Sequence, residues 1–194
     1  MLRLKHSTMA LDALSTEACE PIASDTHPTS LRVILSSISS DSHTWNLVYL
    51  QLLLEEMGHE VINLGACTPD GLIIEACERQ APDLLVISSV NGHGHIDGGR
   101  MIQALRAKCA LKALPAVIGG KLGVKGVDNT VHTEKLLEAG FSAVFDASEN
   151  LQRFGHYVAQ LSYAKEQQEQ AHRTASHRYF RLPMTEQYAR VAAV

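Results

Sequence analysis

Two residues of the sequence, Asp41 and His43, have the types and the spacing of a metal-binding pair. A carboxylate two residues before an imidazole can accept a hydrogen bond from one ring nitrogen, which fixes the tautomer and presents the other nitrogen to a metal ion. The same arrangement raises the basicity of the ligating nitrogen. The alternative is that Asp41 caps the following helix while His43 is merely exposed to solvent. The position of the pair in the fold decides between these interpretations.

Two further segments combine glycines with polar residues, at 88–94 (SSVNGHG) and 119–125 (GGKLGVK). Glycine permits a positive φ or a close approach of the backbone to a ligand, and serine hydroxyls offer adaptable hydrogen bonds. A glycine pair at a strand end is ordinary turn chemistry when it occurs alone. Three such loops on one edge of a sheet indicate a large, elongated ligand.

The elements that must position these loops follow an alternating pattern. Short apolar runs rich in Val, Ile and Leu are each followed by a stretch with helical spacing. The runs predict strands at 31–37, 59–65, 83–90, 114–120 and 142–148. The helices are expected at 45–57, 69–80, 97–110 and 131–139, with a fifth from near Ser148 past Tyr163. Gly58 and Gly140 are expected to end helices, and Thr68 is expected to cap the second one.

Nearly continuous apolar strands that alternate with helices predict an α/β fold with a parallel sheet buried on both faces. The simplest arrangement is a flavodoxin-like, doubly wound five-stranded sheet of strand order 2-1-3-4-5, a Rossmann-like architecture. Its topological switch lies between the first and third strands, and ligands bind there, outside the carboxyl ends of the strands. The loops after Ser37, Val90 and Gly120 should therefore meet at one edge of the sheet.

The chain divides into three expected parts. Residues 1–30 have weak periodicity and form an N-terminal extension, residues 31–164 form the ligand-binding domain, and residues 165–194 form a C-terminal extension. The last segment is too short for a core of its own. It is either an extension of the last helix followed by a docking segment or a frayed tail.

Composition excludes several classes of protein. The formal charge of −4 gives no support to a nucleic-acid or anionic-membrane partner, since either favours a basic face. No apolar run approaches the roughly 20 residues that span a bilayer, and the N-terminus lacks the apolar block of a secretory signal, so a cytoplasmic location is expected. The cysteines form no CxxC pair and predict neither a disulfide framework nor a thiolate zinc site. They are Cys19, Cys67, Cys77 and Cys109.

The three loops together resemble a known signature. Residues 41–46 (DSHTWN), 88–90 (SSV) and 119–120 (GG) are similar to the D-x-H-x-x-G, S-x-L and G-G motif of proteins that bind cobalamin, vitamin B12. The tract 88–97 (SSVNGHGHID) most resembles the small subunit of the glutamate mutase (methylaspartate mutase) family. The resemblance covers about residues 31–160.

The resemblance implies that His43 is the lower axial ligand of cobalt, in place of the cofactor's dimethylbenzimidazole, and that Asp41 orients it. The displaced nucleotide tail is then expected in a deep pocket between the sheet and the last helix. Lys121 and Lys125 either face phosphate or amide oxygens or form a solvated basic pair. The implied cofactor-binding residues are Ser40, Asp41, Ser42, His43, Thr44, Ser88, Ser89, Val90, Gly92, Gly119, Gly120, Lys121, Leu122, Gly123, Val124 and Lys125.

Three positions depart from the family pattern. Asn46 stands where the family has glycine, which is tolerable if the position needs a positive φ, because Asn adopts that conformation more readily than most residues. A side chain that met the corrin there would weaken binding. Val90 replaces leucine, and 146–148 (DAS) replaces a Pro-Gly-Thr-like segment, so the tail pocket is expected to differ in shape.

By the same resemblance the chain is the adenosylcobalamin-binding subunit of a carbon-skeleton mutase that converts L-glutamate to threo-3-methylaspartate. A larger barrel-type subunit must supply the substrate site, because a barrel of about 250 residues does not fit in this chain. A stand-alone B12-binding regulator or carrier, a corrinoid protein for methyl transfer and a flavodoxin-like regulator without cobalamin are the alternatives. His93 and His95 are expected to contact the corrin or a partner rather than to bind zinc.

Overall fold

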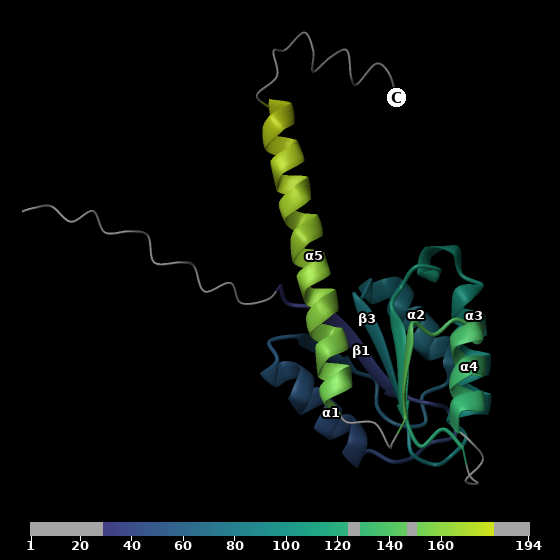
Figure 1. Ribbon diagram of the computed structural model, residues 1–194. Helices are drawn as coiled ribbons and strands as arrows, with labels where there is room; N and C mark the ends of the chain where they lie inside the picture. The colour runs from purple at the N-terminus through teal and green to yellow at the C-terminus, as the bar shows by residue number, and fades with distance from the viewer. Residues whose placement is uncertain (1–28, 124–128, 147–150, 181–194) are drawn as a thin grey trace, which may run out of the picture.

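The computed structural model describes residues 29–123, 129–146 and 151–180. These residues form one parallel sheet with helices on both of its faces (Figure 1). The strand order is β2-β1-β3-β4-β5, which confirms the predicted doubly wound, flavodoxin-like topology. The strands are β1 (Arg32–Ser37), β2 (Glu60–Asn63), β3 (Leu84–Ser89), β4 (Ala116–Gly120) and β5 (Ala143–Asp146).

Each predicted helix is present. They are α1 (Trp45–Glu56), α2 (Asp70–Gln80), α3 (Gly94–Arg106), α4 (Asn129–Ala139) and α5 (Leu151–Phe180), with a short 3₁₀ turn at Cys109–Leu111. Gly58 and Gly140 have φ values of +88° and +124° directly after α1 and α4, as expected of glycines that end helices.

The sheet separates two apolar clusters. On one face, side chains of α2, α3 and α4, such as Ile73, Met101 and Leu136, pack over the strands. On the other face, α1 and α5 contribute Leu47, Leu54 and Val158. Figure 1 shows α1 and α5 on one side of the sheet and α3 and α4 on the other. Because the two clusters bury both faces, the central strand β3 is buried along its whole length.

The predicted start of α2 is wrong at Thr68. The residue before the helix is Pro69, and the Thr68 hydroxyl lies 3.3 Å from the carbonyl oxygen of Leu64 and 3.1 Å from that of Gly65. Thr68 therefore fastens the loop that precedes the helix and does not cap the helix.

The predicted bounds of the third helix, 97–110, are also wrong. The helix begins at Gly94, because the carbonyl oxygen of His93 already accepts the N–H groups of Ile96 and Asp97. It ends at Arg106, and Lys108 adopts an extended conformation with ψ of 118°. Of the segment 88–94, Gly94 thus begins the helix, whereas residues 90–93 form the loop before it.

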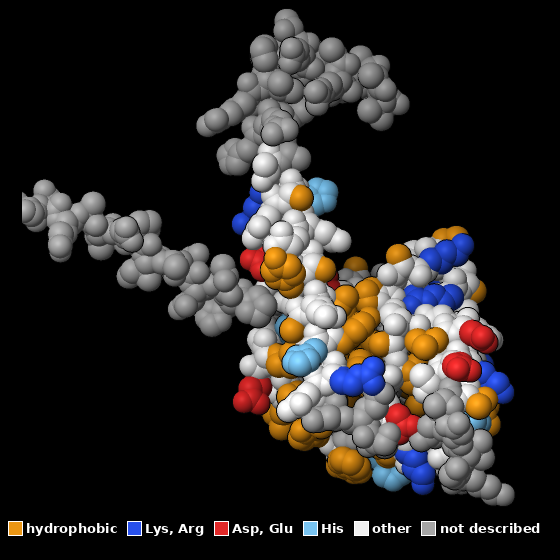
Figure 2. All heavy atoms as spheres, in the orientation of Figure 1, with side chains coloured by type: hydrophobic (Ala, Val, Ile, Leu, Met, Phe, Trp, Pro, Cys, Tyr) orange, Lys and Arg blue, Asp and Glu red, His pale blue; other side chains and the backbone are white. Residues whose placement is uncertain are grey.

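Helix α5 runs without a break through residues 164 and 165 and projects beyond the sheet (Figure 1). The division of the chain at that point stays a prediction, and the predicted helix start near Ser148 lies outside the described residues. Hydrophobic side chains gather in the groove between α5 and α4, over the edge strand β5 (Figure 2). Within the described ranges, no helix combines the length and the apolar character needed to cross a membrane.

Candidate functional site

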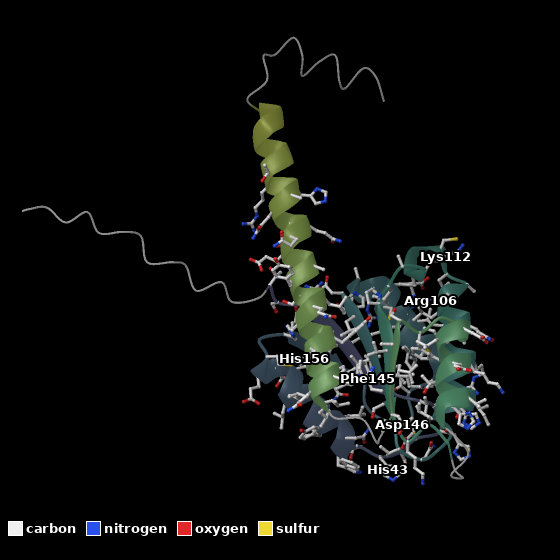
Figure 3. All side chains as sticks on the ribbon, viewed as in Figure 1. His43, Arg106, Lys112, Phe145, Asp146 and His156 are labelled. Atoms are coloured by element: carbon white, nitrogen blue, oxygen red, sulfur yellow. The ribbon has the colours of Figure 1, made fainter. Side chains whose placement is uncertain are left out.

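The carboxyl ends of the three central strands bring the predicted loops together. In the sheet register Ser37 pairs with Ser88, and Ser88 and Ser89 pair with Gly119 and Gly120. Residues far apart in sequence therefore end their strands side by side at the topological switch point. Figure 3 shows His43 and Asp146 at this same end of the sheet.

Asp41 is fully buried and its carboxylate has four hydrogen-bond contacts. Oδ2 accepts the backbone N–H of Val90 at 2.6 Å and that of Asn91 at 3.2 Å. Oδ1 accepts the backbone N–H of His43 at 3.1 Å and lies 2.6 Å from the Nδ1 of the same residue. The residue that precedes α1 is Thr44, whose side chain makes no cap bond. The interpretation of Asp41 as a helix cap is therefore wrong.

Two opposing effects act on the pKa of Asp41. Burial acts to raise the pKa, because it disfavours the charged form. The hydrogen bonds from Val90 N–H, from the His43 ring, from His43 N–H and from Asn91 N–H favour the charged form and together outweigh burial, so the pKa lies below its ordinary value. Asp41 is a carboxylate at neutral pH and can only accept hydrogen bonds.

This carboxylate determines which nitrogen of His43 is available. Because Asp41 can only accept, the neutral imidazole carries its proton on Nδ1 and keeps a lone pair on Nε2. The His43 side chain is 48% exposed, which leaves the ring open to a ligand outside the sheet edge. A carboxylate that fixes the tautomer of an imidazole is the arrangement commonly found behind histidines that bind metal ions in proteins.

A second polar network, which the sequence did not reveal, holds the loop before Asp41. The side-chain amide of Asn91 donates to the backbone carbonyl of Ser40 at 2.9 Å, and the Ser40 hydroxyl donates to Asp97 at 2.5 Å. Arg100 contacts Asp97 at 2.7 Å and the Ser39 hydroxyl at 2.9 Å. The start of α3 thus fastens the loop that carries His43.

A cavity of about 530 Å³ lies next to this edge, between α1, the sheet and the start of α5. Its volume is within the range of roughly 300–1,000 Å³ typical of small-molecule pockets. Apolar and aromatic side chains form most of its wall, and Ser88, Gly119 and Gly120 also line it. The aromatic wall residues, which sequence reasoning missed, are Trp45, Tyr49, Phe145 and Phe154.

The two glycines at the end of β4 are required by the backbone around them. A Cβ at Gly120 would lie 2.2 Å from the carbonyl oxygen of Ser89, and the φ of Gly120 is +101°. A Cβ at Gly119 would lie 3.0 Å from the carbonyl oxygen of Phe145. Glycine at these positions therefore keeps the strand ends closely packed where they line the cavity.

The remaining predicted residues lie around these two features. Ser42 and Thr44 are exposed on either side of His43, and Gly92 has a φ of +86° in the loop before α3. The Ser89 hydroxyl is fully buried, 3.4 Å from the carbonyl oxygen of Lys121. Val90 and Lys121 line the cavity, Leu122 is buried, and Gly123 is partly buried. Val124 and Lys125 lie outside the described residues.

Asn46 behaves differently from its expectation. Among the described residues, the only non-glycine positions with positive φ are Cys67 and Ala81, and Asn46 lies in the first turn of α1. A positive φ therefore does not account for asparagine at this position. The side chain is instead 5% exposed and donates from Nδ2 to the Ser88 hydroxyl at 2.5 Å, in the wall of the cavity.

The histidines of the third loop make other contacts. The Nδ1 of His95 lies 2.7 Å from the carbonyl oxygen of Leu122, and the ring centroid lies 4.0 Å from that of His132. Within the described part of the chain, no three His, Cys, Asp or Glu side chains gather as a potential metal-binding group. His95 thus links the loop after β4 to α3 and α4.

The sequence is also similar to those of known proteins. The sequence profile of the B12 binding domain matches residues 31–150. A glutamate mutase sigma subunit of Fusobacterium nucleatum is 32% identical over 118 residues, which cover 59% of this chain and 83% of that protein. A glutamate mutase sigma subunit of Halobacterium salinarum is 34% identical over 124 residues, which cover 64% of this chain and 80% of that protein.

Solved structures resemble the fold. The monomethylamine corrinoid protein of Methanosarcina barkeri superposes with a TM-score of 0.52 at 16% identity, over 67% of this chain and 57% of that one. At this identity the likeness concerns the architecture alone, an α/β domain with a parallel sheet.

Proposed function

The chain belongs to the B12 binding domain family and, within it, to the glutamate mutase sigma subunits, and we propose that it binds adenosylcobalamin with His43 as the lower cobalt ligand. It is the cobalamin-binding subunit of a mutase complex that interconverts L-glutamate and threo-3-methylaspartate. One observation carries the proposal: the buried Asp41 carboxylate fixes His43 so that Nε2 is available at the switch point, beside a cavity of about 530 Å³.

The residues present fit the cofactor. A cobalamin bound through a protein histidine needs one neutral imidazole nitrogen at the sheet edge and a separate space for its displaced nucleotide. His43 supplies the first, and the cavity lined by Ser88, Gly119 and Gly120 supplies the second. Asn46, which lines the cavity, also has a buried polar atom without a hydrogen-bond partner, its Oδ1, and such an atom favours an occupant that can donate to it.

Adenosylcobalamin, when bound, supplies a radical by homolysis of its cobalt–carbon bond. The protein residues do other work. Asp41 keeps the proton of His43 on Nδ1 and holds the ring in place, and Asn91, Ser40 and Arg100 hold the loop that carries both. In this proposal Ser88 and the glycines at the end of β4 leave space for the nucleotide tail, and Lys121, which lines the cavity, is assigned to its phosphate.

We further propose that a larger barrel-type subunit covers the exposed side of His43. Radical chemistry needs a closed site that excludes side reactions. The candidate site residues that the structure describes lie at one edge of the sheet and do not enclose a site by themselves. Two large apolar side chains beside that edge are solvent-exposed, Trp45 at 65% and Ile96 at 58%. Ile96 directly follows His95, which is expected from the sequence to contact the corrin or a partner. The cytoplasmic location stays a prediction.

Reconstitution tests the proposal. The purified chain is mixed with adenosylcobalamin and a glutamate mutase large subunit, and formation of 3-methylaspartate from glutamate is followed. We expect no turnover from either subunit alone and turnover from the mixture, with loss of turnover when His43→Ala replaces the wild-type chain. Tight cofactor binding without turnover would contradict the mutase assignment and leave a cobalamin carrier or regulator.

A further inference from the structure

We propose that Asn46 and Ser88 recognise the lower base, which is the base of the cofactor's displaced nucleotide. They select a cobamide whose base carries an amino group over one whose base is dimethylbenzimidazole. The inference rests on the proposed function, because it assumes that the displaced nucleotide enters the cavity between α1, the sheet and α5. It goes beyond that function by naming the class of cobamide.

The first observation is an unpaired acceptor. Asn46 is 5% exposed and lines the cavity, and its Oδ1 is buried without any hydrogen-bond partner, whereas its Nδ2 donates to Ser88. A buried carbonyl oxygen left unpaired costs free energy, so an occupant that brings an N–H group to it gains affinity.

The second observation is an unused donor beside it. Ser88 is also 5% exposed, and its hydroxyl oxygen already accepts the hydrogen of Asn46 Nδ2. Its own proton has no acceptor among the hydrogen bonds of the described residues and is available to a ring nitrogen. The pair thus offers one unpaired acceptor, Asn46 Oδ1, and one unused donor, the Ser88 O–H, on two residues that line the same cavity.

The chemistry of lower bases distinguishes between occupants of this site. Dimethylbenzimidazole that has left cobalt offers a ring nitrogen that accepts a hydrogen bond but has no N–H donor. An aminopurine offers a ring nitrogen and, next to it, an exocyclic amino group that donates. Only the aminopurine satisfies both Ser88 and Asn46. The aromatic walls formed by Trp45, Tyr49, Phe145 and Phe154 suit a flat base of either kind and do not discriminate between them.

The replacement of the motif glycine by Asn46 also supports recognition of the base. Glycine at position 46 has no side chain that can accept a hydrogen bond, and it leaves Ser88 without the amide that occupies its oxygen. Asparagine at this position therefore changes the hydrogen-bonding capacity of the wall and takes up space in the cavity. Both changes concern the base, since Asn46 lies on the cavity side of α1 and is almost fully buried.

The test compares affinities of the full chain for three corrinoids with the same upper ligand: cobalamin, the adenine-containing cobamide, and cobinamide, which has no nucleotide. Binding is followed by quenching of Trp45, the chain's one tryptophan, and by cobalt absorption spectra. We expect the adenine cobamide to bind about three- to tenfold more tightly than cobalamin, as one added hydrogen bond to a buried group allows.

Two variants isolate the side chain. Asn46→Gly removes it, and Asn46→Leu keeps its bulk without its polar atoms, so both should lose the preference for the adenine cobamide over cobalamin. Val48→Gly places a glycine in the same helix outside the cavity wall and should keep the preference. Equal affinities of the wild-type chain for the two cobamides, or a preference that survives in both Asn46 variants, would overturn the inference. Absence of binding to every corrinoid would instead refute the proposed function.

Discussion

The two halves of the site differ in how completely their polar groups are paired. Around His43, the buried carboxylate of Asp41 has four hydrogen-bond contacts, and Ser40, Asn91 and Arg100 fasten the loop. In the cavity half, Asn46 keeps a buried oxygen without a partner. A fully paired hydrogen-bond network holds one geometry, as a metal ligand requires. A buried polar atom without a partner instead gains a hydrogen bond when a ligand that can donate to it enters the cavity. This contrast fits the two proposals, in which the first half holds the cobalt ligand His43 and the second half selects the base of the cobamide.

The largest effect is expected from a change at the boundary of the two halves, Gly120→Ala. The new Cβ would lie 2.2 Å from the carbonyl oxygen of Ser89 at a φ of +101°. We expect a loss of about 2–5 kcal/mol in the free energy of unfolding from backbone strain and overpacking. Urea denaturation followed by circular dichroism measures it.

Gly99→Ala is the matched control, because a Cβ at Gly99 in α3 meets no atom within 4 Å. This variant should be as stable as the wild type or more stable by about 0.5–1 kcal/mol, owing to the higher helix propensity of alanine. If Gly120→Ala proved as stable as Gly99→Ala, the close packing of β4 against β3 would not depend on glycine.

The next effect concerns only the half of the site around His43. Asp41→Asn removes the charge that fixes His43, and we expect cobinamide and cobalamin to bind about 10- to 100-fold more weakly. The two corrinoids should lose affinity equally, since the cavity is untouched. Glu75→Gln on the exposed side of α2 removes a charge of the same sign away from the site and should leave binding unchanged. Affinity unchanged in Asp41→Asn would separate Asp41 from ligation.

The smallest effect is a pH dependence of stability. The folded pKa of Asp41 lies below its ordinary value of 3.8, because the hydrogen bonds to the carboxylate outweigh burial. The stabilisation is complete well above pH 3.8 and is lost as the pH falls from the unfolded pKa through the folded one. The stability difference between wild type and Asp41→Asn should therefore shrink between pH 6 and pH 3. A difference independent of pH would mean that the carboxylate charge contributes nothing to folding.

The contrast between the halves also explains which parts of the molecule could be predicted from sequence. The strand order followed from five apolar runs that alternate with helical segments, and it placed Asp41 and His43 at the switch point. Asp41 and His43 lie within three residues of the chain, so their interaction could be predicted from the local sequence. The role of Thr68 and the start of α3 at Gly94 were missed, because tertiary contacts of the loops decide them.

The cavity half was harder to predict for a physical reason. Its wall combines α1, three strands and α5, and the contact of Asn46 with Ser88 joins residues that are distant in sequence. Sequence reasoning weighed a positive φ at Asn46 against a side chain that meets the corrin, whereas the structure shows a buried side chain that is hydrogen-bonded to Ser88. The wall residues on α1 are spaced three or four positions apart, as Trp45 and Tyr49 are, which is also the spacing on the core-facing side of an ordinary helix, so they gave no specific signal.

The most direct test of the central claim is electron paramagnetic resonance of the Co(II) corrinoid bound to protein labelled with nitrogen-15 in histidine. If His43 is the lower ligand, the cobalt signal carries the two-line splitting of a nitrogen-15 nucleus, and His43→Ala abolishes that splitting. A three-line splitting from the unlabelled cofactor nitrogen, or a signal without axial nitrogen coupling in the wild-type chain, would contradict the account.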